Sequence, residues 1–233
     1  MISVCIPTYN GQKYIKQQLE SILIQLSQDD EIIISDDSSS DDTLNIIKSL
    51  NDSRITVFEN NTFHSPIYNL ENALKYAKGD YIFLSDQDDI WKKNKVKIII
   101  DNLQHSNLVV HDAEIIDEHN NLINESFYKT NKTHSGVIHN LLKNGFIGCC
   151  MAFNRKVLEV CLPFPKNIPM HDSWIGIKTY CTVKNVKFIP DKLIEYRRHG
   201  NNASASGEKS KRPLLQKLKD RIVIIYSVIK RNR

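Results

Sequence analysis

The chain has 233 residues, of which 41% are hydrophobic and 25% are charged. This ordinary globular composition suits one large domain with a buried core better than two complete domains. The chain contains no apolar run of about 18 residues, the length that a membrane-spanning helix requires. Because a strand-like segment begins already at residue 2, no room remains for a signal peptide, and we expect a soluble, cytoplasmic protein.

Strand-like and helical segments alternate along the first half of the chain. Runs rich in isoleucine, valine and aromatic residues predict strands over residues 2–6, 32–34, 55–58 and 81–84, and apolar side chains at helical spacing predict helices over 12–26, 42–50 and 68–77. Weaker signals predict helices over 92–103 and 172–181 and strands over 108–110, 149–153 and 186–189. The βαβαβ order indicates an α/β domain with a mostly parallel, doubly wound sheet, which binds ligands at the carboxyl ends of its strands.

Three aspartates crowd the carboxyl end of the strand predicted over residues 81–84. Asp86, Asp88 and Asp89 repel one another at neutral pH unless a hard divalent cation or a cation-bridged phosphate neutralises them. In an extended chain Asp86 and Asp88 point to the same side, as two ligands of a metal ion or a ribose would. Asp88 or Asp89 can instead cap the helix over 92–103, but capping needs only one carboxylate. We therefore expect the active site here, with capping as a second role for Asp89.

The ends of the first two strands carry further polar residues. Residues 7–11 read Pro-Thr-Tyr-Asn-Gly, which is neither the glycine-rich fingerprint of a dinucleotide site nor a phosphate-binding P-loop. Residues 35–43 read Ser-Asp-Asp-Ser-Ser-Ser-Asp-Asp-Thr, with more carboxylates than helix capping requires. An aspartate at this strand end can accept the N–H of a pyrimidine base, and Tyr9 can stack on the face of that base.

Five ordered motifs resemble those of the inverting family 2 glycosyltransferases. Three are N-terminal: Pro-Thr-Tyr-Asn at 7–10, Asp-Asp-Ser-Ser-Ser-Asp-Asp-Thr at 36–43 and Ser-Asp-Gln-Asp-Asp-Ile-Trp at 85–91. Two later motifs, His-Asp-Ser-Trp at 171–174 and Tyr-Arg-Arg-His-Gly-Asn-Asn at 196–202, resemble the bacterial polysaccharide branch, which includes rhamnosyl-, galactosyl- and glucosyltransferases. The resemblance covers residues 1–202 and implies a single GT-A-type domain, a Rossmann-like, mostly parallel sheet flanked by helices.

The resemblance also implies a site for a nucleoside diphosphate sugar. Asp37 and Tyr9 would hold the base, while Pro7 and Asp36 would shape the base pocket. Asp86 is the first carboxylate of the family's D-x-D motif, which commonly meets the ribose or the metal ion.

A metal site follows from the same resemblance. Asp86 and Asp88 would bind Mn²⁺ or Mg²⁺ that bridges the diphosphate, and His199 matches a histidine that completes this site in some relatives. Arg197 and Arg198 would add contacts to the phosphates. Because imidazole suits Mg²⁺ less well than Mn²⁺, His199 can also be a loop residue without a ligand role.

Asp172 is the catalytic base that the resemblance implies. Inverting transfer needs a carboxylate that takes the proton of the acceptor hydroxyl while this hydroxyl attacks the anomeric carbon. Asp172 can also cap the helix over 172–181, and both roles are compatible because a carboxylate at a helix start stays ionised. Many relatives have Glu-Asp at this point, so His171 either tunes the base or takes no part.

The segment over residues 145–151 has two interpretations. Its glycines allow the backbone to approach a sugar closely, and the corresponding stretch of the resembling family lines the boundary between donor and acceptor. A plain core strand explains it equally well. Cys149 is not expected to be a nucleophile, because direct displacement forms no covalent intermediate.

The positive charge of the chain is concentrated in its tail. The net charge is +4, but residues 207–233 hold nine Lys or Arg against two acidic residues, a balance of +7 that leaves about −3 for residues 1–206. Within the tail Leu214, Leu218, Ile222, Ile225 and Ile229 recur at helical spacing, which predicts a basic amphipathic helix. This helix either packs on its own domain or binds an anionic membrane surface. We thus divide the chain into a glycosyltransferase domain over 1–206 and a tail over 207–233, joined by the small residues 203–207.

These expectations combine into one function. We expect a metal-dependent inverting glycosyltransferase that moves a sugar from a nucleoside diphosphate sugar to a lipid-linked or oligosaccharide acceptor of a surface glycan, such as lipopolysaccharide or capsule. It would act in the cytoplasm at the inner face of the cell membrane, and nucleic acid is not an expected partner because the tail has one aromatic residue. The alternatives are a non-catalytic nucleotide-sugar-binding partner subunit and a sugar nucleotidylyltransferase. The latter would need a glycine-rich, basic loop after the first strand, which residues 7–11 do not provide.

Overall fold

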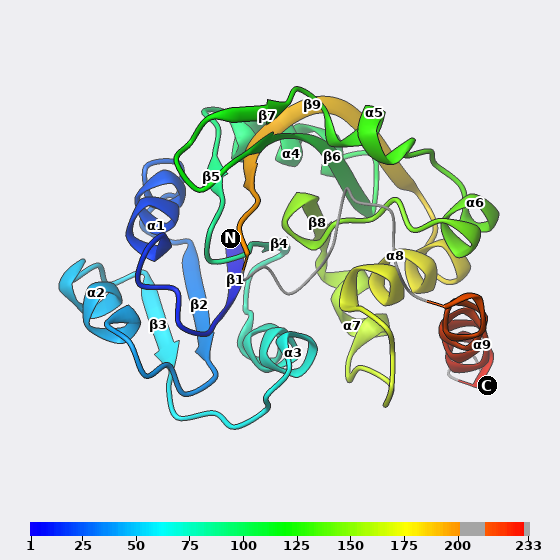
Figure 1. Cartoon of the computed structure of the whole chain (residues 1–233), viewed down its shortest axis with the longest axis horizontal. Coiled ribbons are helices and arrows are strands. Elements are labelled where there is room, and N and C mark those ends of the chain that lie inside the picture. The colour runs from blue at the N-terminus through cyan, green and yellow to red at the C-terminus, as the bar shows by residue number, and fades with distance from the viewer. Residues whose placement is uncertain (201–212, 231–233) are drawn as a thin grey trace.

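The computed structural model describes residues 1–200 and 213–230 (Figure 1). Its strands are β1 (Ile2–Thr8), β2 (Glu31–Asp36), β3 (Ile55–Phe58), β4 (Tyr81–Leu84), β5 (Ile90–Trp91), β6 (Leu108–Ile116), β7 (Leu122–Asn124), β8 (Met151–Asn154) and β9 (Val186–Arg197). Its helices are α1 (Ile15–Leu23), α2 (Thr43–Ser49), α3 (Pro66–Tyr76), α4 (Lys95–Leu103), α5 (Phe127–Asn131), α6 (Val137–Leu142), α7 (Arg155–Cys161), α8 (His171–Cys181) and α9 (Leu214–Lys230), with a 3₁₀ turn η1 (Gly148–Cys150).

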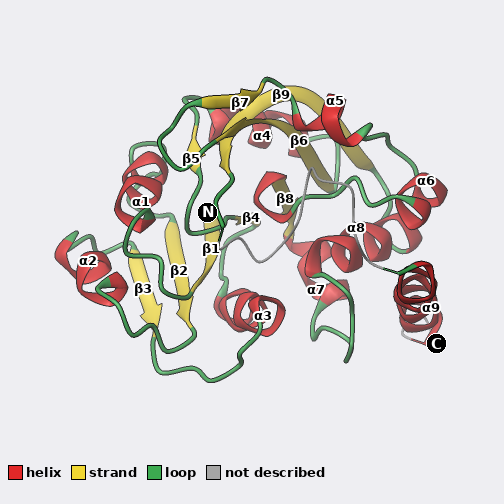
Figure 2. Cartoon of the chain, viewed as in Figure 1, coloured by secondary structure: helices red, strands yellow, loops and turns green. Residues whose placement is uncertain are grey.

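One curled sheet, flanked by helices, organises the fold (Figure 2). Its strand order is β3-β2-β1-β4-β8-β6-β9-β5, and β7 pairs with β6 outside this path. β1 pairs in parallel with β2 and β4, and β2 with β3, as the βαβαβ pattern predicts. β8 is antiparallel to both β4 and β6, whereas the long pairing of β6 with β9 is parallel. The α/β class and the mostly parallel sheet are therefore confirmed.

Alternate residues of the parallel strands face two separate cores. Val4 and Ile6 of β1 pack in one core together with Leu19 of α1 and with residues of α2 and α4. Cys5 points the other way and packs with Trp174 of α8 and with residues of α3 and α7. Because both faces are covered, the strands read as nearly continuous apolar runs, which is why the sequence located them. Each fully buried aliphatic side chain contributes about 1.5–3 kcal/mol to folding.

The second half of the sheet departs from the expected segments. The strand expected at 108–110 continues to Ile116 as β6, and the one expected at 186–189 continues to Arg197 as β9. The strand expected at 149–153 begins only at Met151, because Gly148–Cys150 form η1. The short elements β5, β7, α5, α6 and α7 were not expected at all, since two to seven residues give little periodicity to read.

The tail contains the predicted helix, and this helix packs on the domain. Ile224 and Val228 of α9 are buried in the core that includes Trp174 of α8. Arg221 donates a hydrogen bond from Nε to the carbonyl oxygen of Leu141 in α6, at 2.9 Å. The predicted boundary at 206/207 and the small-residue segment 203–207 lie outside the described residues. Among the helices that the structure describes, none combines the length and the apolar character needed to cross a membrane.

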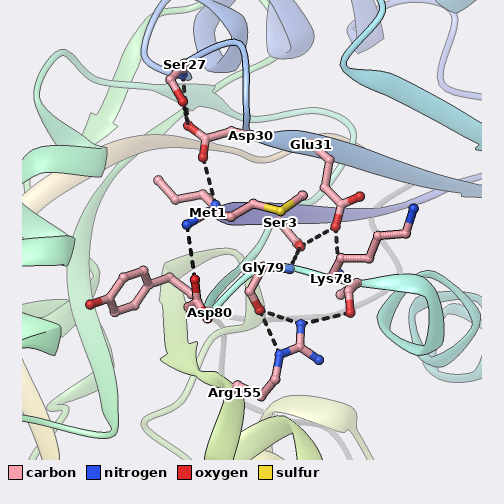
Figure 3. Close-up of polar contacts among 12 residues, drawn as sticks. Met1, Ser3, Ser27, Asp30, Glu31, Lys78, Gly79, Asp80 and Arg155 are labelled. Atoms are coloured by element: carbon pink, nitrogen blue, oxygen red, sulfur yellow. Dashed lines mark hydrogen bonds and ion pairs between the residues drawn. The ribbon is translucent and has the colours of Figure 1, made fainter.

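A polar network closes the amino ends of β1, β2 and β4 (Figure 3). Asp30 accepts hydrogen bonds from the Ile2 amide at 2.7 Å and from the amide and hydroxyl of Ser27, both at 2.8 Å. Glu31 accepts one from the Ser3 hydroxyl at 2.6 Å. These carboxylates connect neighbouring chain segments, and the groups that donate hydrogen bonds to them belong to the protein itself.

Candidate active site

A cavity of about 440 Å³ lies at the opposite, carboxyl ends of the same strands, facing the amino end of α8. Six of the residues singled out in the sequence line it: Pro7, Tyr9, Asp37, Asp86, Asp88 and Asp172. The strand topology explains this convergence, since the carboxyl ends of parallel strands meet at one edge of a sheet. His171 and Gly148, which the sequence left open, line the cavity as well.

Tyr9 and Asp37 form one wall. The Tyr9 side chain is 57% exposed, so the face of its ring is accessible. Its backbone is held by Gln87, whose side chain accepts from the Tyr9 amide at 2.9 Å and donates to the Tyr9 carbonyl at 3.0 Å. A Cβ atom at Gly11 would lie 2.4 Å from Gln87 Oε1, so a side chain there would displace this clamp. Asp37 is buried and accepts from the amides of the loop at 63–65.

Asp36 lies behind the cavity wall and is fully buried. Its carboxylate accepts hydrogen bonds from the Thr8 hydroxyl at 2.7 Å and from the hydroxyl and amide of Ser39 at 2.6 and 2.8 Å. These bonds tie the loop after β1 to the loop after β2. A role of Asp36 in shaping a base pocket, and any direct contact of Asp36 with a nucleotide, stay predictions.

Three carboxylates form a crowded cluster at the end of β4. Burial, followed by the charge of Asp88, raises the pKa of Asp86 to about 7. Burial and the charges of Asp88 and Asp86 raise the pKa of Asp89 well above its usual range. His199 approaches the same cluster, with Nε2 2.8 Å from Asp88 Oδ2, and its ring stacks on Tyr14. The structure thus brings Asp88 and His199 into contact, whereas the ligand atoms of Asp86 lie within 4.8 Å of those of Asp89 and Cys149; a metal site that Asp86, Asp88 and His199 share stays a prediction.

The donor chemistry of this cluster fits a divalent cation. Asp89 Oδ2 is buried and has no hydrogen-bond partner, and ligand atoms of Asp86, Asp89 and Cys149 lie within 4.8 Å of one another. Carboxylate oxygens suit Mg²⁺ and Mn²⁺. Burial raises the pKa of the Cys149 thiol well above its usual range, so the carboxylates are the fitting ligands and the thiol is not.

A buried lysine partly balances these negative charges. Lys95 is 1% exposed; its Nζ donates to the Cys149 carbonyl at 3.0 Å and lies 4.3 Å from the centre of the Trp91 ring. Burial lowers the pKa of Lys95 to about 8, while the nearby acidic groups act in the opposite direction. One cation does not match three carboxylates, and the cluster retains an excess of acidic groups.

Arg197 donates hydrogen bonds to two residues of the carboxylate cluster. Its amide donates to Asp89 Oδ1 at 3.0 Å and its Nε to the Asp88 carbonyl at 2.8 Å. The two terminal nitrogens donate to Asn120 Oδ1 at 2.6 Å and to Gln17 Oε1 at 3.2 Å. Since every guanidinium nitrogen has a protein partner and Arg197 does not line the cavity, the structure supports a positioning role. The expected phosphate contacts of Arg197 and of the half-buried Arg198 stay predictions.

Asp172 stands in the first turn of α8, on the wall opposite the strand ends. Its Oδ1 accepts from the amide and hydroxyl of Ser173, and its Oδ2 accepts from Asn144 Nδ2 at 3.4 Å. Burial raises the pKa of Asp172 to about 6, and these hydrogen bonds oppose the rise. The carboxylate is therefore ionised at neutral pH yet close to a useful pKa for proton transfer.

His171 shares the turn with Asp172. It is 6% exposed, and a Cβ at Gly148 would lie 2.6 Å from its Nε2, so glycine is what allows the ring to lie there. Burial lowers the pKa of His171 to about 4, which keeps the imidazole neutral. Its Nδ1 is buried without a hydrogen-bond partner. The ring lines the cavity, but this nitrogen is covered by protein.

Sequence reasoning missed three supporting residues. Gln87 could have been found, because it is the middle residue of the Asp86–Asp88 motif, but the prediction considered only the charged residues of that motif. Lys95 and Asn144 gave no signal: one reads as an ordinary surface lysine of a helix, and the other touches Asp172 across 28 positions of the chain.

The comparisons with known proteins agree with this geometry. The family description "Glycosyl transferase family 2" matches residues 3–162. The chain belongs to glycosyl transferase family 2. Among its family relatives, UDP-Glc:alpha-D-GlcNAc-diphosphoundecaprenol beta-1,3-glucosyltransferase WfgD of Escherichia coli is 32% identical over 71% of this chain and 64% of its own length. dTDP-rhamnosyl transferase RfbG of Shigella flexneri is 30% identical over 84% of this chain and 72% of its own length.

Solved structures show the same fold. TarS 1-349 of S. aureus in complex with UDP-GlcNAc has a TM-score of 0.75 at 20% identity, over 96% of this chain and 66% of that one. Mannosyltransferase PcManGT from Pyrobaculum calidifontis, in complex with GDP-Man and Mn²⁺, has a TM-score of 0.64 at 20% identity, over 88% and 58%. The GT-A fold expected for this family 2 chain is confirmed, as is the resemblance to bacterial polysaccharide glycosyltransferases.

Proposed function

We propose that this family 2 chain is a divalent-cation-dependent, inverting glycosyltransferase. It takes a sugar from a nucleoside diphosphate donor and transfers it to a lipid-linked or oligosaccharide acceptor of a bacterial surface glycan. The observation that carries the proposal is that one cavity is lined both by Asp86 and Asp88, which follow β4, and by Asp172 of α8. WfgD and RfbG, whose names state a UDP-glucose and a dTDP-rhamnose specificity, support the donor class.

The base of the donor is proposed to bind between Tyr9 and Asp37. The accessible Tyr9 ring offers a stacking surface, and Gln87 fixes the backbone that carries it. Asp37 is fixed by backbone amides of the loop at 63–65 and lies at the cavity wall, where a carboxylate can accept a base N–H. Pro7 and the Asp36 hydrogen bonds would set the position of this pocket.

The diphosphate is proposed to lie near the carboxylate cluster. Asp86 and Asp88, together with His199 or the unpartnered oxygen of Asp89, would hold Mn²⁺ or Mg²⁺. Such a cation, when bound, supplies Lewis-acid stabilisation of the charge that develops on the leaving diphosphate. The chain's own residues keep the carboxylates in place: Arg197 holds the backbone of Asp88 and one oxygen of Asp89.

Asp172 is proposed to act as the base. It would accept the proton of the acceptor hydroxyl as the oxygen attacks the anomeric carbon on the face opposite the leaving group, so that configuration inverts. Ser173 and Asn144 orient the carboxylate by hydrogen bonds. The neutral imidazole of His171, which lines the cavity, would lie next to the base.

The acceptor class and the location belong to the same proposal. The names of WfgD and of a Campylobacter jejuni relative that is 40% identical over 38% of this chain contain an undecaprenol-linked acceptor. We place the enzyme in the cytoplasm at the inner face of the cell membrane, where its donor is soluble and a lipid-linked acceptor is within reach. The division into a transferase domain over 1–206 and a basic tail over 207–233 is part of this proposal.

A donor panel tests the proposed function. UDP-, dTDP- and GDP-sugars are incubated with the protein, with and without Mn²⁺, and the thermal shift of the protein and the anomeric configuration of the released sugar or product are measured. We expect one nucleotide to raise the melting temperature only with the cation, and a β product from an α-linked donor. The proposal fails if wild-type activity persists undiminished in EDTA or if the product retains the donor configuration.

A further inference from the structure

The outer face of α9 carries a row of large apolar side chains that the fold leaves uncovered. The row consists of Leu215, Leu218, Ile222, Ile225, Tyr226 and Ile229, whose exposed fractions run from 43% to 81%. At 3.6 residues per turn these six positions fall within an arc of about 100°. Single exposed apolar residues are ordinary, but a contiguous row of this kind marks an interaction surface.

The row is not the face by which α9 attaches to the domain. Ile224 and Val228 are buried against the core that contains Trp174 of α8. Arg221 adds the hydrogen bond from Nε to the Leu141 carbonyl at 2.9 Å and a second bond to the Leu142 carbonyl. Since another side of the helix makes these contacts, the apolar row is not the face that attaches α9 to the described residues.

Helix α6 extends the exposed apolar surface. Ile138 and Leu142 stand one turn apart on α6 and are 72% and 63% exposed. The bonds of Arg221 bring the end of α6 to the middle of α9, where Leu218 and Ile225 flank Arg221 by about one turn on either side. Both helices lie at the same edge of the molecule, next to α8 (Figure 1). We call these two residues and the α9 row the α6–α9 surface.

Cationic side chains border this surface. On the helix Lys219 and Lys230, both exposed, adjoin the row on one side, and Arg221 lies toward the other side. The single acidic residue of α9, Asp220, lies away from the row and accepts a hydrogen bond from Gln216 at 2.8 Å. The rim of the surface therefore has one sign of charge, which selects an anionic partner.

We propose that the α6–α9 surface docks on an anionic lipid bilayer, with the apolar row in the interface and the bordering cations at the lipid phosphates. Amphipathic helices with this division of faces lie in the plane of the membrane, and the basic rim adds attraction to anionic headgroups. Helix α8 carries Asp172 in its first turn and packs against α9. If the proposed function holds, docking would bring the enzyme to the membrane that contains a lipid-linked acceptor.

A second copy of the chain is a poorer occupant. Leu215, Leu218, Ile222, Ile225 and Ile229 do follow the spacing of a coiled-coil seam. The flanking positions hold Lys219 and Arg221, so that a parallel pair of α9 helices would bring like charges together. The row also covers only two heptads, which is short for a stable coiled coil.

Vesicle sedimentation tests the docking without any sugar substrate, so its outcome does not depend on the proposed transfer. The wild-type chain is compared with the triple variant Leu218→Gln, Ile222→Gln, Ile229→Gln. The control variant is Ile24→Gln, Leu122→Gln, Ile123→Gln, which removes the same residue types at similar exposure elsewhere on the surface. Each protein is mixed with vesicles of phosphatidylcholine alone or of equal parts phosphatidylcholine and phosphatidylglycerol. Circular dichroism and thermal melting check that all three are folded.

We expect the wild type and the control to sediment with the anionic vesicles. The affinity of the α9 variant for these vesicles should be lower by at least roughly tenfold. Binding of the wild type should also weaken on pure phosphatidylcholine and at high salt. Equal sedimentation of the α9 variant and the wild type would overturn the proposal, as would a wild type that stays in the supernatant. A lipid-free dimer of the wild type that only the α9 variant dissociates, without vesicle binding, would assign the surface to a second copy instead.

Discussion

The carboxylates at the two ends of the parallel strands differ in how far protein groups compensate their negative charge. At the amino ends of β1 and β2 Asp30 and Glu31 accept hydrogen bonds from backbone amides and serine hydroxyls, and no cation is needed (Figure 3). At the carboxyl end of β4 Asp86, Asp88 and Asp89 crowd together, the pKa values of Asp86 and Asp89 are raised, and one oxygen of Asp89 has no partner. The protein itself supplies hydrogen-bond donors to the amino-end carboxylates, whereas it leaves the carboxyl-end cluster with unbalanced negative charge, as the proposed cation site would need.

Asp36 shows that position alone does not decide the matter. It stands at a carboxyl strand end, yet the hydroxyls of Thr8 and Ser39 satisfy it as fully as Ser27 satisfies Asp30. A carboxylate surrounded by protein donors builds structure, whereas one surrounded by other carboxylates stores unfavourable electrostatic energy until a cation or proton arrives. The candidate site is therefore recognised by carboxylates that lack hydrogen-bond donors or a balancing positive charge, rather than by the presence of aspartate alone.

The largest effect should follow from removing one charge of the cluster. Asp88→Asn keeps the shape of the side chain but loses the charge, and we expect Mn²⁺-dependent donor binding to weaken and turnover to fall by roughly 1,000-fold or more, the worth of several kcal/mol of metal stabilisation. Steady-state kinetics and calorimetric donor binding measure this. The matched control at the amino end is Asp80→Asn, an exposed carboxylate, which should leave both unchanged. Equal activity of Asp88→Asn and Asp80→Asn would mean that the carboxylates at the two ends of the strands do not differ in function.

The next effect concerns the opposite wall. Asp172→Asn should lower kcat by about 100- to 10,000-fold, the usual contribution of a general base, with little change in donor affinity. Product formation and donor-induced thermal shift separate the two quantities. The exposed Asp101→Asn on α4 serves as the control. Wild-type turnover in Asp172→Asn would show that another group accepts the proton.

A pH profile refines the same assignment. Because the pKa of Asp172 is raised to about 6 and the ionised form is the base, kcat should be constant above this pH and fall about tenfold per unit below it. The hydrogen bond from Asn144 stabilises the ionised form, so Asn144→Ala should raise this pKa and shift the acidic limb of the profile to higher pH. An unshifted limb in Asn144→Ala, or a wild-type profile without any acidic limb, would contradict the assignment.

The sequence located the fold where the chain is periodic and the site where chemistry is local. β1 to β4 and α1 to α3 have apolar patterns over consecutive residues, and the cluster at 86–89 is a strand-end run of charges, so both could be read directly. The antiparallel insertion of β8 could not, because its four residues pair with β4 and β6 only through the tertiary fold.

Long-range contacts set the limit at the site as well. The sequence motif that contains Arg197 suggested phosphate contacts. Its hydrogen-bond partners Gln17, Asn120 and Asp88 instead come from helix α1 and from two loops, and only the folded chain brings them together. For the same reason the helical pattern of the tail gave the right helix, while the pattern could not reveal that Ile224 and Val228 form the packed side. Residue spacing predicts that a helix has an apolar face, and tertiary packing determines which side of the helix contacts the rest of the domain.

The smallest effect should come from the amino end, as a loss of stability with activity intact. Asp30→Ala leaves the buried amide of Ile2 and the partly buried amide of Ser27 without their acceptor, which should lower the free energy of unfolding by about 1–3 kcal/mol. Urea unfolding measures this, and the neighbouring exposed Asp29→Ala is the control that should change little. At a temperature where both variants are fully folded, kcat should equal that of the wild type, because the network lies at the other end of the strands from the cavity. A fall in kcat without a fall in stability would mean that the two ends are coupled through the strands, and the separation of roles along the sheet would no longer hold.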